Sequence, residues 1–558
     1  MSRMRALLLW FAQDDEHKAL RLWLLALLVL GSGLGLRDPW PPAEPALALM
    51  MRQMADSGEW LIPYLAGEPF SDHPPLVIWL GAALYSVTGS LRLGFLLPSL
   101  LAALGTLWLV FDLGRRLWGE RAGRLAAIAL LCAFQFSLQA HRGQVDATFT
   151  FFTTLALYGL LRYLLLEASP RWLVAAGAAI GFAMLTKGAG YIALLVLLPW
   201  LWMRAQHWDE LPERPGLRAL WPLVATAFGV VLSWALPALA FVSGADDFAL
   251  DQFRRELLWN LLGGADLLLG GPEQPPWYLT LQAVALWLPL TLLLPWLLPI
   301  WRQRLRDRDP RTGLLLGFVL AVIALFSMLP GRHGVQILPA LPAFALLVGV
   351  NIGGTWWRPG VQWLSRGTLL AIGAGLLTLS GLALREPLEF GLRLPPDTPW
   401  GLLVFMGGLG ALALVLSIAL SLRSRHQALA LPVFIGVAWV LIGWAIYPWL
   451  NTVRTPERLL AKVEAELPAQ GEVTLAMLDW RPQFSLATRR PLRPLYGEDP
   501  GAAIEAFCGD GAEYRGVIAP QRVYEDMPLP ALGLGPAITL GVRHRSLWLY
   551  APCVRDEG

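Results

Sequence analysis

Charged residues, histidines and cysteines are all scarce in this sequence. Of its 558 residues, 15% are charged, seven are histidine and three are cysteine, and the formal net charge is +3. So small a net charge gives no reason to expect a nucleic-acid partner. No repeat of 20–50 residues is visible, so a solenoid or a propeller is not expected.

Apolar residues, by contrast, are abundant. Hydrophobic residues make up 56% of the chain, and the mean hydropathy is +0.52. A soluble domain cannot bury that much apolar surface, so the bilayer must act as the solvent for most of the chain. The 27 tryptophans agree with this, because indole rings favour the membrane interface.

Long apolar runs predict an α-helical polytopic membrane protein. A spanning helix needs roughly 20 mostly apolar residues, and about thirteen runs approach that length. We expect the first run to stay in place as a spanning helix, because no small-residue cleavage site clearly follows it. The runs are 19–36, 92–113, 123–140, 147–166, 172–186, 188–203, 219–242, 277–300, 313–329, 335–352, 367–383, 401–422 and 428–449.

The placement of arginine decides the orientation. The run 75–90 is apolar but short. If it does not cross the membrane, every arginine cluster between the longer runs falls on the N-terminal side, which the positive-inside rule makes the cytoplasm. We therefore expect 37–91 to be one long outer loop with juxtamembrane helices. The clusters are Arg115, Arg116, Arg121 and Arg124; Arg162 and Arg171; Arg204, Arg214 and Arg218; Arg302, Arg304, Arg306, Arg308 and Arg311; and Arg423 and Arg425.

This orientation predicts a transmembrane module over residues 1–449 and a periplasmic domain over 450–558. Hydropathy falls and charges appear in the last segment, which predicts a small α/β domain. Residues 454–467 have helical spacing. Three segments look like short buried strands: 473–478, 514–520 and 546–552.

The cysteines say less about the fold. Cys508 and Cys553 both lie in the C-terminal segment. If that segment is extracytoplasmic they can form a disulfide, but the sequence leaves bonded and free states equally open. Cys132 lies in an apolar run and is expected to serve packing.

Four polar clusters lie at the outer membrane face, where charge is expensive to bury. The first follows the first span and contains Asp38 and Glu44. Pro45 suits a first helical turn, Leu47, Met50, Met51 and Met54 recur at helical spacing, and Gly58 can end the helix. We expect an amphipathic helix lying on the membrane. Glu44 is then either a functional acid or only a favourable acid at a helix N-terminus.

The second cluster, Asp72 and His73, precedes a Pro-Pro corner. The aspartate can bind a metal ion or a sugar hydroxyl, and the histidine can contact a phosphate. Alternatively, the pair is a turn with a capping aspartate.

The third cluster is a very short loop with His141, Arg142 and Asp146. Asp146 either caps its helix or, with its neighbours, lines the rim of a cavity.

The fourth cluster centres on Lys187, between two apolar helices. Its ammonium either reaches the interface without further function or serves as a cation for a lipid phosphate. Arg92, Arg254 and Arg255 can also bind the lipid phosphate.

Together the four clusters place acids and bases on one membrane face, which suits transfer of a group from a lipid phosphate carrier. That chemistry needs a carboxylate to activate the acceptor and cations or a divalent metal to stabilise the departing phosphate.

The order of these features resembles the GT-C glycosyltransferases of the protein O-mannosyltransferase type, and especially the bacterial aminoarabinose (lipid A) transferases. The likeness covers most of residues 20–350. Each matching motif is weak alone, and their order is specific. The matches are Ser57, Gly58, Trp60 and Pro63; Asp72, His73, Pro74 and Pro75; Arg92; Asp146; the LTKG element 185–188; and the ILPALP element 337–342.

The resemblance implies a GT-C fold in the bacterial inner membrane and a defined reaction. A sugar leaves a polyprenyl-phosphate donor with inversion on the periplasmic face and passes to a lipid or glycan acceptor. The resemblance places a divalent metal ion at Asp72 and the lipid phosphate at His73 and Lys187. Membrane lipids are the other expected partners.

One departure from the family pattern affects the catalytic acid. The family usually has Asp-Glu where this chain has Ala43 and Glu44, and alanine cannot accept a proton. Either Glu44, Asp38 or Asp146 takes the role, or the acceptor is already an anion and needs no strong base. The remaining alternatives are a non-catalytic relative that binds lipid phosphate and a membrane transporter.

Overall fold

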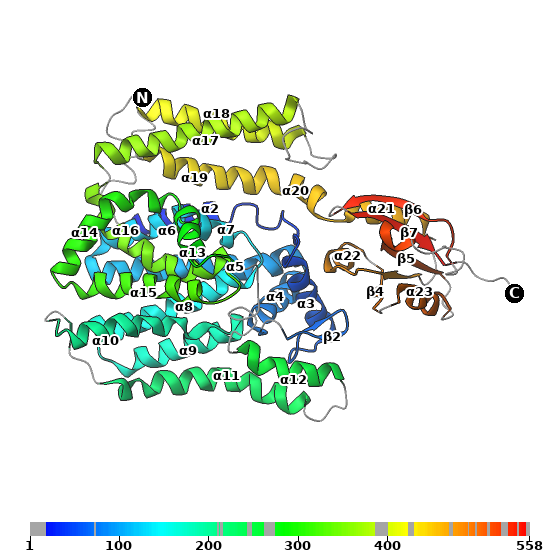
Figure 1. Ribbon diagram of the computed structural model, residues 1–558, viewed down its shortest axis with the longest axis horizontal. Helices are drawn as coiled ribbons and strands as arrows, with labels where there is room; N and C mark the ends of the chain where they lie inside the picture. Colours follow the sequence, from blue (N-terminus) through cyan, green and yellow to red (C-terminus); the bar gives the residue numbers. More distant parts are fainter. Residues whose placement is uncertain are drawn as a thin grey trace.

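A computed structural model describes residues 18–71, 74–208, 211–212, 216–242, 248–261, 274–355, 357–385, 400–421, 429–467, 473–488, 490–496, 499–509, 514–525, 534–543 and 546–553. Long helices lie side by side in one bundle, and a smaller domain with a sheet projects from one end of it (Figure 1). The expected fold class, a helical polytopic membrane protein with a small C-terminal α/β domain, is confirmed.

Most of the bundle consists of single long helices. α8 ends in a π-helical turn, η1 (Arg162–Leu166), and a second such turn, η8 (Ile442–Ile446), joins α19 to α20. The bounds are α2 (Lys18–Leu30), α5 (Leu91–Trp118), α8 (Val145–Leu161), α9 (Pro170–Lys187), α11 (Trp221–Val242) after η3 (Leu217–Leu220), α15 (Pro310–Met328), α16 (Leu341–Thr355) after η6 (Gly334–Ala340), α17 (Pro359–Arg385), α18 (Trp400–Ser421), α19 (Ala430–Leu441) and α20 (Tyr447–Arg454).

Other parts of the bundle are broken or short. α6 (Glu120–Cys132) and α7 (Phe134–Ala140) meet at an angle of 71°. α13 (Tyr278–Leu286) bends by 97° into the run formed by η5 (Leu290–Leu293) and α14 (Leu294–Arg306). The run 190–205 consists of η2 (Gly190–Val196) and α10 (Leu197–Ala205).

Each of the predicted apolar runs contains helix, but length and apolarity alone support fewer spans than thirteen. Within the described residues, eight helices are long and apolar enough to cross a membrane, or up to ten if each bent pair is one span. Thirteen is reached only if α2, α9 and the run 190–205 also cross.

The first outer loop forms a compact group at the end of the bundle that carries the C-terminal domain. It contains α3 (Glu44–Ser57), the hairpin β1 (Tyr64–Leu65) and β2 (Glu68–Pro69), and α4 (Leu76–Thr88). α4 has 13 residues and is therefore about 20 Å long, too short for a hydrocarbon core of roughly 30 Å. α12 (Phe248–Leu261) lies at the same end, whereas α10 and α14 lie at the opposite end (Figure 1).

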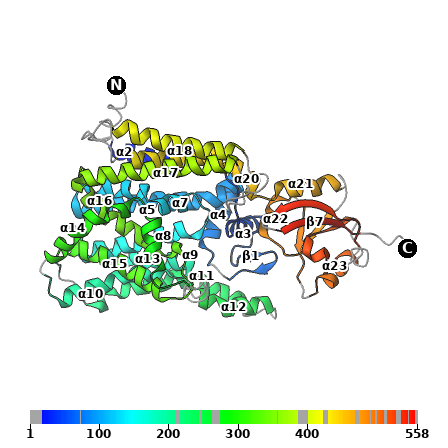
Figure 2. The same cartoon turned by 45° about the horizontal axis from the view of Figure 1, so that its top comes forward.

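The predicted bounds of α3 are confirmed, but its apolar stripe packs against protein rather than against lipid. Gly58 ends the helix with a φ of 75°, a left-handed conformation that glycine adopts without strain. Leu47, Met50, Met51 and Met54 are buried against Val77, Ile78 and Ala82 of α4 and Phe95 of α5. Figure 2 shows α3 between α4 and the C-terminal domain. The methionine stripe therefore faces protein.

The C-terminal domain is a mixed five-stranded sheet with short helices. The strand order is β4-β3-β5-β7-β6, with β3 parallel to β4 and β5, and β7 antiparallel to β5 and β6. The strands are β3 (Val473–Met477), β4 (Leu492–Pro494), β5 (Tyr514–Pro520), β6 (Ile538–Arg543) and β7 (Ser546–Pro552). The helices are α21 (Glu457–Glu466), α22 (Pro482–Ala487), α23 (Pro500–Gly509) and α24 (Gln521–Glu525).

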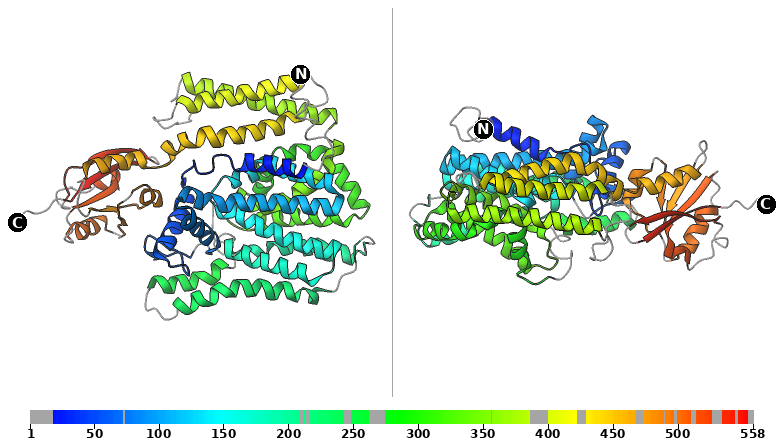
Figure 3. Two further views of the ribbon diagram at one scale, coloured as in Figure 1. Left: turned by 180° about the vertical axis from the view of Figure 1, so that it is seen from behind. Right: turned by 90° about the horizontal axis from the view of Figure 1, so that it is seen from above.

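The predicted helix and all three predicted strands are confirmed as α21, β3, β5 and β7, whereas β4 and β6 were not predicted. Alternate residues of β3 and β5 enter two cores, so both faces of the sheet are covered. Cys508 and Cys553 form a disulfide, which settles the alternative that the sequence left open. Both views in Figure 3 show the domain beyond the same end of the bundle.

Close backbone packing fixes the chain where it leaves α2. Gly33 has a φ of 73°, and a Cβ atom there would lie 2.5 Å from the carbonyl oxygen of Gly443. Gly443 lies in η8, and a Cβ atom there would lie 2.6 Å from the backbone carbonyl carbon of Ser32, so the two backbones are in direct contact. The loop that carries Arg37 and Asp38 therefore starts from a fixed point.

Candidate active site

A buried ion pair joins the first outer loop to the loop between α7 and α8. Nη2 of Arg37 donates to both carboxylate oxygens of Glu44, at 2.7 and 2.6 Å. The backbone N–H groups of Trp40 and Gly143 donate to the same carboxylate, at 2.9 and 3.2 Å. The residues Arg37 and Glu44 are 4% and 2% exposed. With four hydrogen bonds in a buried position, this carboxylate is held in a fixed place.

The guanidinium of Arg37 is held on its other sides as well. Nη1 donates to the carbonyl oxygen of His141 at 2.9 Å. The group lies 4.1 Å from the ring centroid of Trp40 and 5.8 Å from that of Tyr447, distances at which a cation is attracted to an aromatic face. Arg37 therefore connects the exit of α2, the loop after α7, and α20.

A second ion pair brings together two of the predicted residues, Asp38 and Arg92. Nε and Nη2 of Arg92 donate to the two oxygens of Asp38 at 2.5 and 3.2 Å. The Arg92 side chain is 47% exposed and that of Asp38 is 13% exposed. This pair is therefore open to an incoming ligand on the arginine side.

Asn451 holds the loop on which these groups are carried. Its Oδ1 accepts from the backbone N–H of Asp38 at 3.1 Å and from Nε1 of Trp40 at 2.9 Å, and its Nδ2 donates to the carbonyl oxygen of Leu36 at 2.8 Å. Asn451 is 7% exposed and lies on α20, just before the C-terminal domain. Because all three bonds go to residues around Arg37 and Asp38, Asn451 acts by positioning them.

The third ion pair joins Asp146, in the first turn of α8, to Lys187, in the last turn of α9. Nζ of Lys187 lies 2.7 Å from Oδ1 of Asp146, and the side chains are 11% and 12% exposed. A cavity of about 10 Å³ beside them, room for about one water molecule, is lined by apolar residues together with Thr150 and Gln336. Among these, Oγ1 of Thr150 is buried without a hydrogen-bond partner in the described residues. A partly buried charge pair next to a buried hydroxyl without a partner makes this a polar position where α8 begins and α9 ends.

His141 has a structural role in this arrangement. Its ring stacks on Trp439 at 4.8 Å with an interplanar angle of 7°. Its Nδ1 lies 2.7 Å from the carbonyl oxygen of Ser137, and its Nε2 lies 3.1 Å from the carbonyl oxygen of Val29, so either ring nitrogen can donate to a backbone oxygen. Burial lowers the pKa of His141 to about 4. The neutral ring therefore cannot attract a phosphate by charge.

The structure describes the remaining predicted site residues only in part. Asp72 and His73 lie outside the described residues, as does the side chain of Arg254. Arg255 is exposed on α12. The segment before Asp72 is tied to α12, because Nδ2 of Asn260 donates to the carbonyl oxygen of Ser71 at 2.8 Å, and the Ser71 hydroxyl bonds to Glu256. No group of three or more His, Cys, Asp or Glu residues that could hold a metal ion occurs in the described part of the chain.

In the first ion pair, the sequence predicted Glu44 as a site residue but not its partner Arg37. Arg37 directly follows the first span, where an arginine is commonly explained by its reach to the interface. Asn451 and Trp40 carry no motif at all. The only usable signal was the run Arg37–Asp38 beside an aromatic residue, which is too short to distinguish from a membrane-flanking charge.

Comparison with known proteins agrees with this architecture. The family described as dolichyl-phosphate-mannose-protein mannosyltransferase matches residues 72–234. The undecaprenyl phosphate-alpha-4-amino-4-deoxy-L-arabinose arabinosyl transferase of Pseudomonas paraeruginosa (strain DSM 24068 / PA7) is 30% identical over 451 residues, which are 77% of this chain and 76% of that protein. The protein of the same name from Pseudomonas aeruginosa (strain UCBPP-PA14) is 30% identical over 452 residues, with the same coverage of both chains.

The fold is also that of a solved structure. ArnT from Cupriavidus metallidurans bound to undecaprenyl phosphate superposes with a TM-score of 0.76 and 19% identity, over 97% of this chain and 99% of that one. Fold and sequence together define a membrane glycosyltransferase of the GT-C class. Within that class, the chain belongs to the ArnT-like family of polyprenyl-phosphate-dependent enzymes.

Proposed function

We propose that this enzyme transfers a sugar, with inversion, from a polyprenyl-phosphate donor to a lipid or glycan acceptor at the periplasmic face of a bacterial inner membrane. The observation that carries the proposal is the Asp146–Lys187 pair, two opposite charges 2.7 Å apart and only about a tenth exposed. The names of the relatives support the donor, because they are undecaprenyl-phosphate aminoarabinose transferases.

The orientation follows from charge and redox chemistry. α10 and α14 carry Arg204, Arg302, Arg304 and Arg306 at the end of the bundle away from the C-terminal domain, and such clusters mark the cytoplasmic side. The Cys508–Cys553 disulfide suits an oxidising compartment. We therefore propose a transmembrane module over 1–449 and a periplasmic domain over 450–558.

The transfer forms a bond from an acceptor oxygen to the anomeric carbon and breaks the bond from that carbon to the phosphate oxygen. The phosphate leaves with the bonding electrons, and the acceptor proton passes to a carboxylate. Lys187 binds the phosphate, with Arg92, Arg254, Arg255 and His73 as further predicted contacts. Of the three candidate acids, Asp146 and Asp38 are the better bases, because the oxygens of Glu44 already accept four hydrogen bonds. A metal ion at Asp72 stays a prediction, and no step here depends on it.

The purified enzyme, incubated with undecaprenyl-phosphate 4-amino-4-deoxy-L-arabinose and lipid A, is expected to release undecaprenyl phosphate and add one sugar to the acceptor. Mass spectrometry of lipids and glycans from cells with and without the gene identifies the natural product. If neither experiment detects transfer while undecaprenyl phosphate still binds, the chain is a non-catalytic relative. Movement of the donor across liposomes without sugar transfer would instead support a transporter.

Replacing Ala43 by aspartate separates the explanations for the missing family acid. Ala43 is the exposed N-cap of α3 and has no side-chain cap. Aspartate there should stabilise the helix by about 0.5–2 kcal/mol. Because Asp146 and Asp38 remain as bases, we expect kcat to change by less than about tenfold.

Ala43→Ser is the matched control, since serine caps the helix without adding a carboxylate. Thermal unfolding and steady-state kinetics are measured for both variants. A gain in kcat of about a hundredfold or more in Ala43→Asp alone would show that the natural chain lacks its base.

A further inference from the structure

A network of charged side chains joins α5, α8 and α9 far from the candidate active site. Nη1 of Arg311, in the first turn of α15, donates to the carbonyl oxygen of Leu117 near the end of α5 at 2.6 Å. The network therefore lies at the end of the bundle that carries α10 and α14 (Figure 1), which the proposed orientation makes the cytoplasmic side. This arginine network consists of Arg115, Arg116, Arg162 and Arg171 with Asp112 and Glu167.

The network is built on a carboxylate inside a spanning helix. Asp112 of α5 is 3% exposed and accepts from three donors: Nη2 of Arg115, Nε of Arg116 and the hydroxyl of Tyr158 on α8. A buried acid in a membrane span is expensive. The positive-inside rule requires arginines at this end but no such acid, so Asp112 serves to hold two guanidiniums in fixed positions.

Arg162, in η1 at the end of α8, extends the network to α9. The residue is 7% exposed, its Nη1 donates to the hydroxyl of Tyr158 at 2.9 Å, and its guanidinium lies 4.0 Å from the ring centroid of Trp172. Glu167 lies 3.6 Å from Nη2 of Arg162, and both its oxygens accept from Nη2 of Arg171 at 2.7 Å. Two acids therefore hold four arginines, which leaves the network with two positive charges.

Three of the four guanidiniums reach the surface beside an exposed apolar face. The side chains of Arg115, Arg116 and Arg171 are 48%, 38% and 64% exposed. Leu101 and Trp108 precede Arg115 on α5 at intervals of seven residues, and they are 57% and 50% exposed. Residues seven apart lie on one face of a helix, so an apolar face of α5 leads along the membrane interior to a fixed cation.

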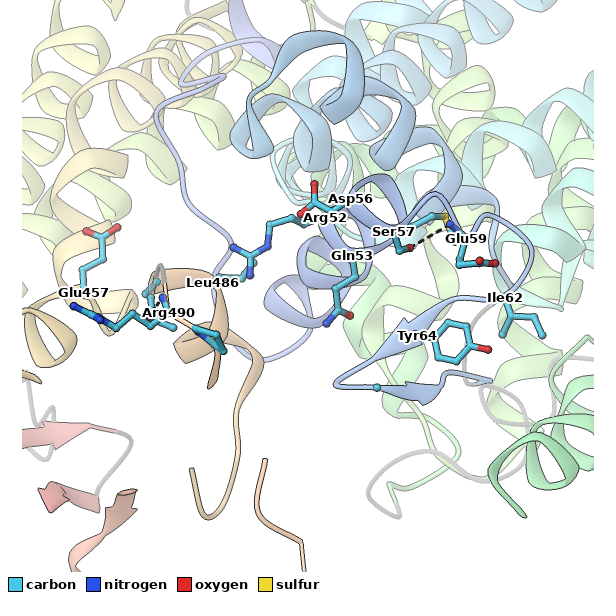
Figure 4. A pocket seen from close by; sticks show the side chains of 15 residues that line it. Arg52, Gln53, Asp56, Ser57, Glu59, Ile62, Tyr64, Glu457, Leu486 and Arg490 are labelled. Carbon is cyan, nitrogen blue, oxygen red and sulfur yellow. Dashed lines mark hydrogen bonds between the residues drawn. The ribbon is translucent and has the colours of Figure 1, made fainter. Parts of the chain in front are cut away.

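The excess of positive charge belongs to this end of the molecule. At the opposite end, a cavity of about 1110 Å³ between the first outer loop and the C-terminal domain is lined by Asp56, Glu59 and Glu457 with Arg52 and Arg490 (Figure 4). Acids outnumber cations in that cavity, whereas cations outnumber acids in the arginine network. An anionic ligand is therefore favoured at the network.

We propose that the arginine network binds the phosphate of an anionic phospholipid, whose acyl chains lie along the exposed face of α5. Guanidinium groups bind phosphate oxygens through charge-assisted hydrogen bonds, and basic sites between spanning helices on the cytoplasmic side bind anionic lipid headgroups. The ring of Trp108 suits the boundary between headgroup and acyl chains. The inference goes beyond the proposed function, because it concerns a separate site and involves no sugar transfer.

Native mass spectrometry of the whole purified protein in detergent tests the proposal with dioleoylphosphatidylglycerol. The reference lipid is dioleoylphosphatidylcholine, which has the same chains and no net charge. The wild type is expected to bind the anionic lipid about tenfold more tightly. Arg115→Gln and Arg171→Gln should each weaken this binding by about fivefold. Arg171→Lys should retain most of the affinity, because an ammonium still pairs with phosphate.

Arg302→Gln, on the exposed side of α14 at the same end, is the matched control, because it removes the same charge outside the network. It should bind the anionic lipid like the wild type, and thermal unfolding without lipid checks the fold of every variant. Equal binding of the two lipids by the wild type, or an equal loss in Arg302→Gln, overturns the proposal.

Two further outcomes also count against the lipid. Variants of Arg115 and Arg171 that lose thermal stability but keep the affinity for dioleoylphosphatidylglycerol would make the network purely structural. Inorganic phosphate that displaces the lipid at equal concentration would show that the site takes free phosphate instead. Because none of these measurements uses the donor or the acceptor, their result is independent of whether the protein transfers a sugar.

Discussion

Replacing Asp146 by asparagine is expected to lower kcat/KM by roughly 10²–10⁴ and, because the Lys187 ammonium loses its countercharge, to lower stability to a smaller extent. Asparagine has the same shape and can still accept from Lys187, whose Nζ lies 2.7 Å from Oδ1, but it cannot take the acceptor proton. Steady-state transfer kinetics with undecaprenyl-phosphate aminoarabinose measure the loss, and a thermal unfolding curve checks the fold.

Lys187→Met tests the other half of the pair. Losing a charge-assisted bond to the donor phosphate should weaken donor binding by about 10- to 100-fold. The uncompensated Asp146, only 12% exposed, should also lower stability, because a buried charge without its partner is costly.

The double variant Asp146→Asn with Lys187→Met removes both charges and is the control for that cost. Its thermal midpoint should recover relative to Lys187→Met, since no unpaired charge remains, whereas transfer should stay at the low level of the single variants. A stable Asp146→Asn protein that keeps more than about a tenth of the wild-type kcat/KM would remove Asp146 from the reaction.

The sequence predicted the elements well where one local rule was sufficient. Pro45, the Met50–Met54 stripe and Gly58 together define both ends of α3 and its buried face. What they could not predict is which surface that face meets, because placing 75–90 in the outer loop does not say that α4 packs against α3. Of the missed strands, β4 has only three residues and β6 contains a glycine at a register shift, so neither has a clear alternating pattern.

The site shows the same limit at longer range. The sequence identified Asp38, Arg92, Asp146 and Lys187 as polar residues at one membrane face, but the pairs it left unassigned are separated by 54 and 41 residues. Pairing depends on how α5 packs beside the loop after α2 and on how α8 packs beside α9, which no local pattern encodes. Asn451 is 413 residues from Asp38, and only the tertiary fold reveals its role.

Arg37→Met is expected to cause the largest loss of stability, about 3–5 kcal/mol in the free energy of unfolding. The change leaves the Glu44 carboxylate, 2% exposed, with only the N–H groups of Trp40 and Gly143 as donors. Arg37→Lys should lose less, yet still fall below the wild type, because an ammonium cannot reproduce the planar guanidinium contacts with the carboxylate and Trp40. Thermal unfolding in detergent micelles measures the order of the variants.

The double variant Arg37→Met with Glu44→Leu decides whether Glu44 acts as an acid or as a support. Removing both charges should restore part of the stability, since no unpaired carboxylate remains, although the N–H groups of Trp40 and Gly143 lose their acceptor. If Glu44 takes no proton in the reaction, transfer in the double variant should recover to the extent that stability does, because Asp146 and Asp38 remain paired with Lys187 and Arg92. A stable double variant whose kcat stays about 10² or more below the wild type would instead make Glu44 the catalytic carboxylate. Its four hydrogen bonds would then have to rearrange when substrate binds.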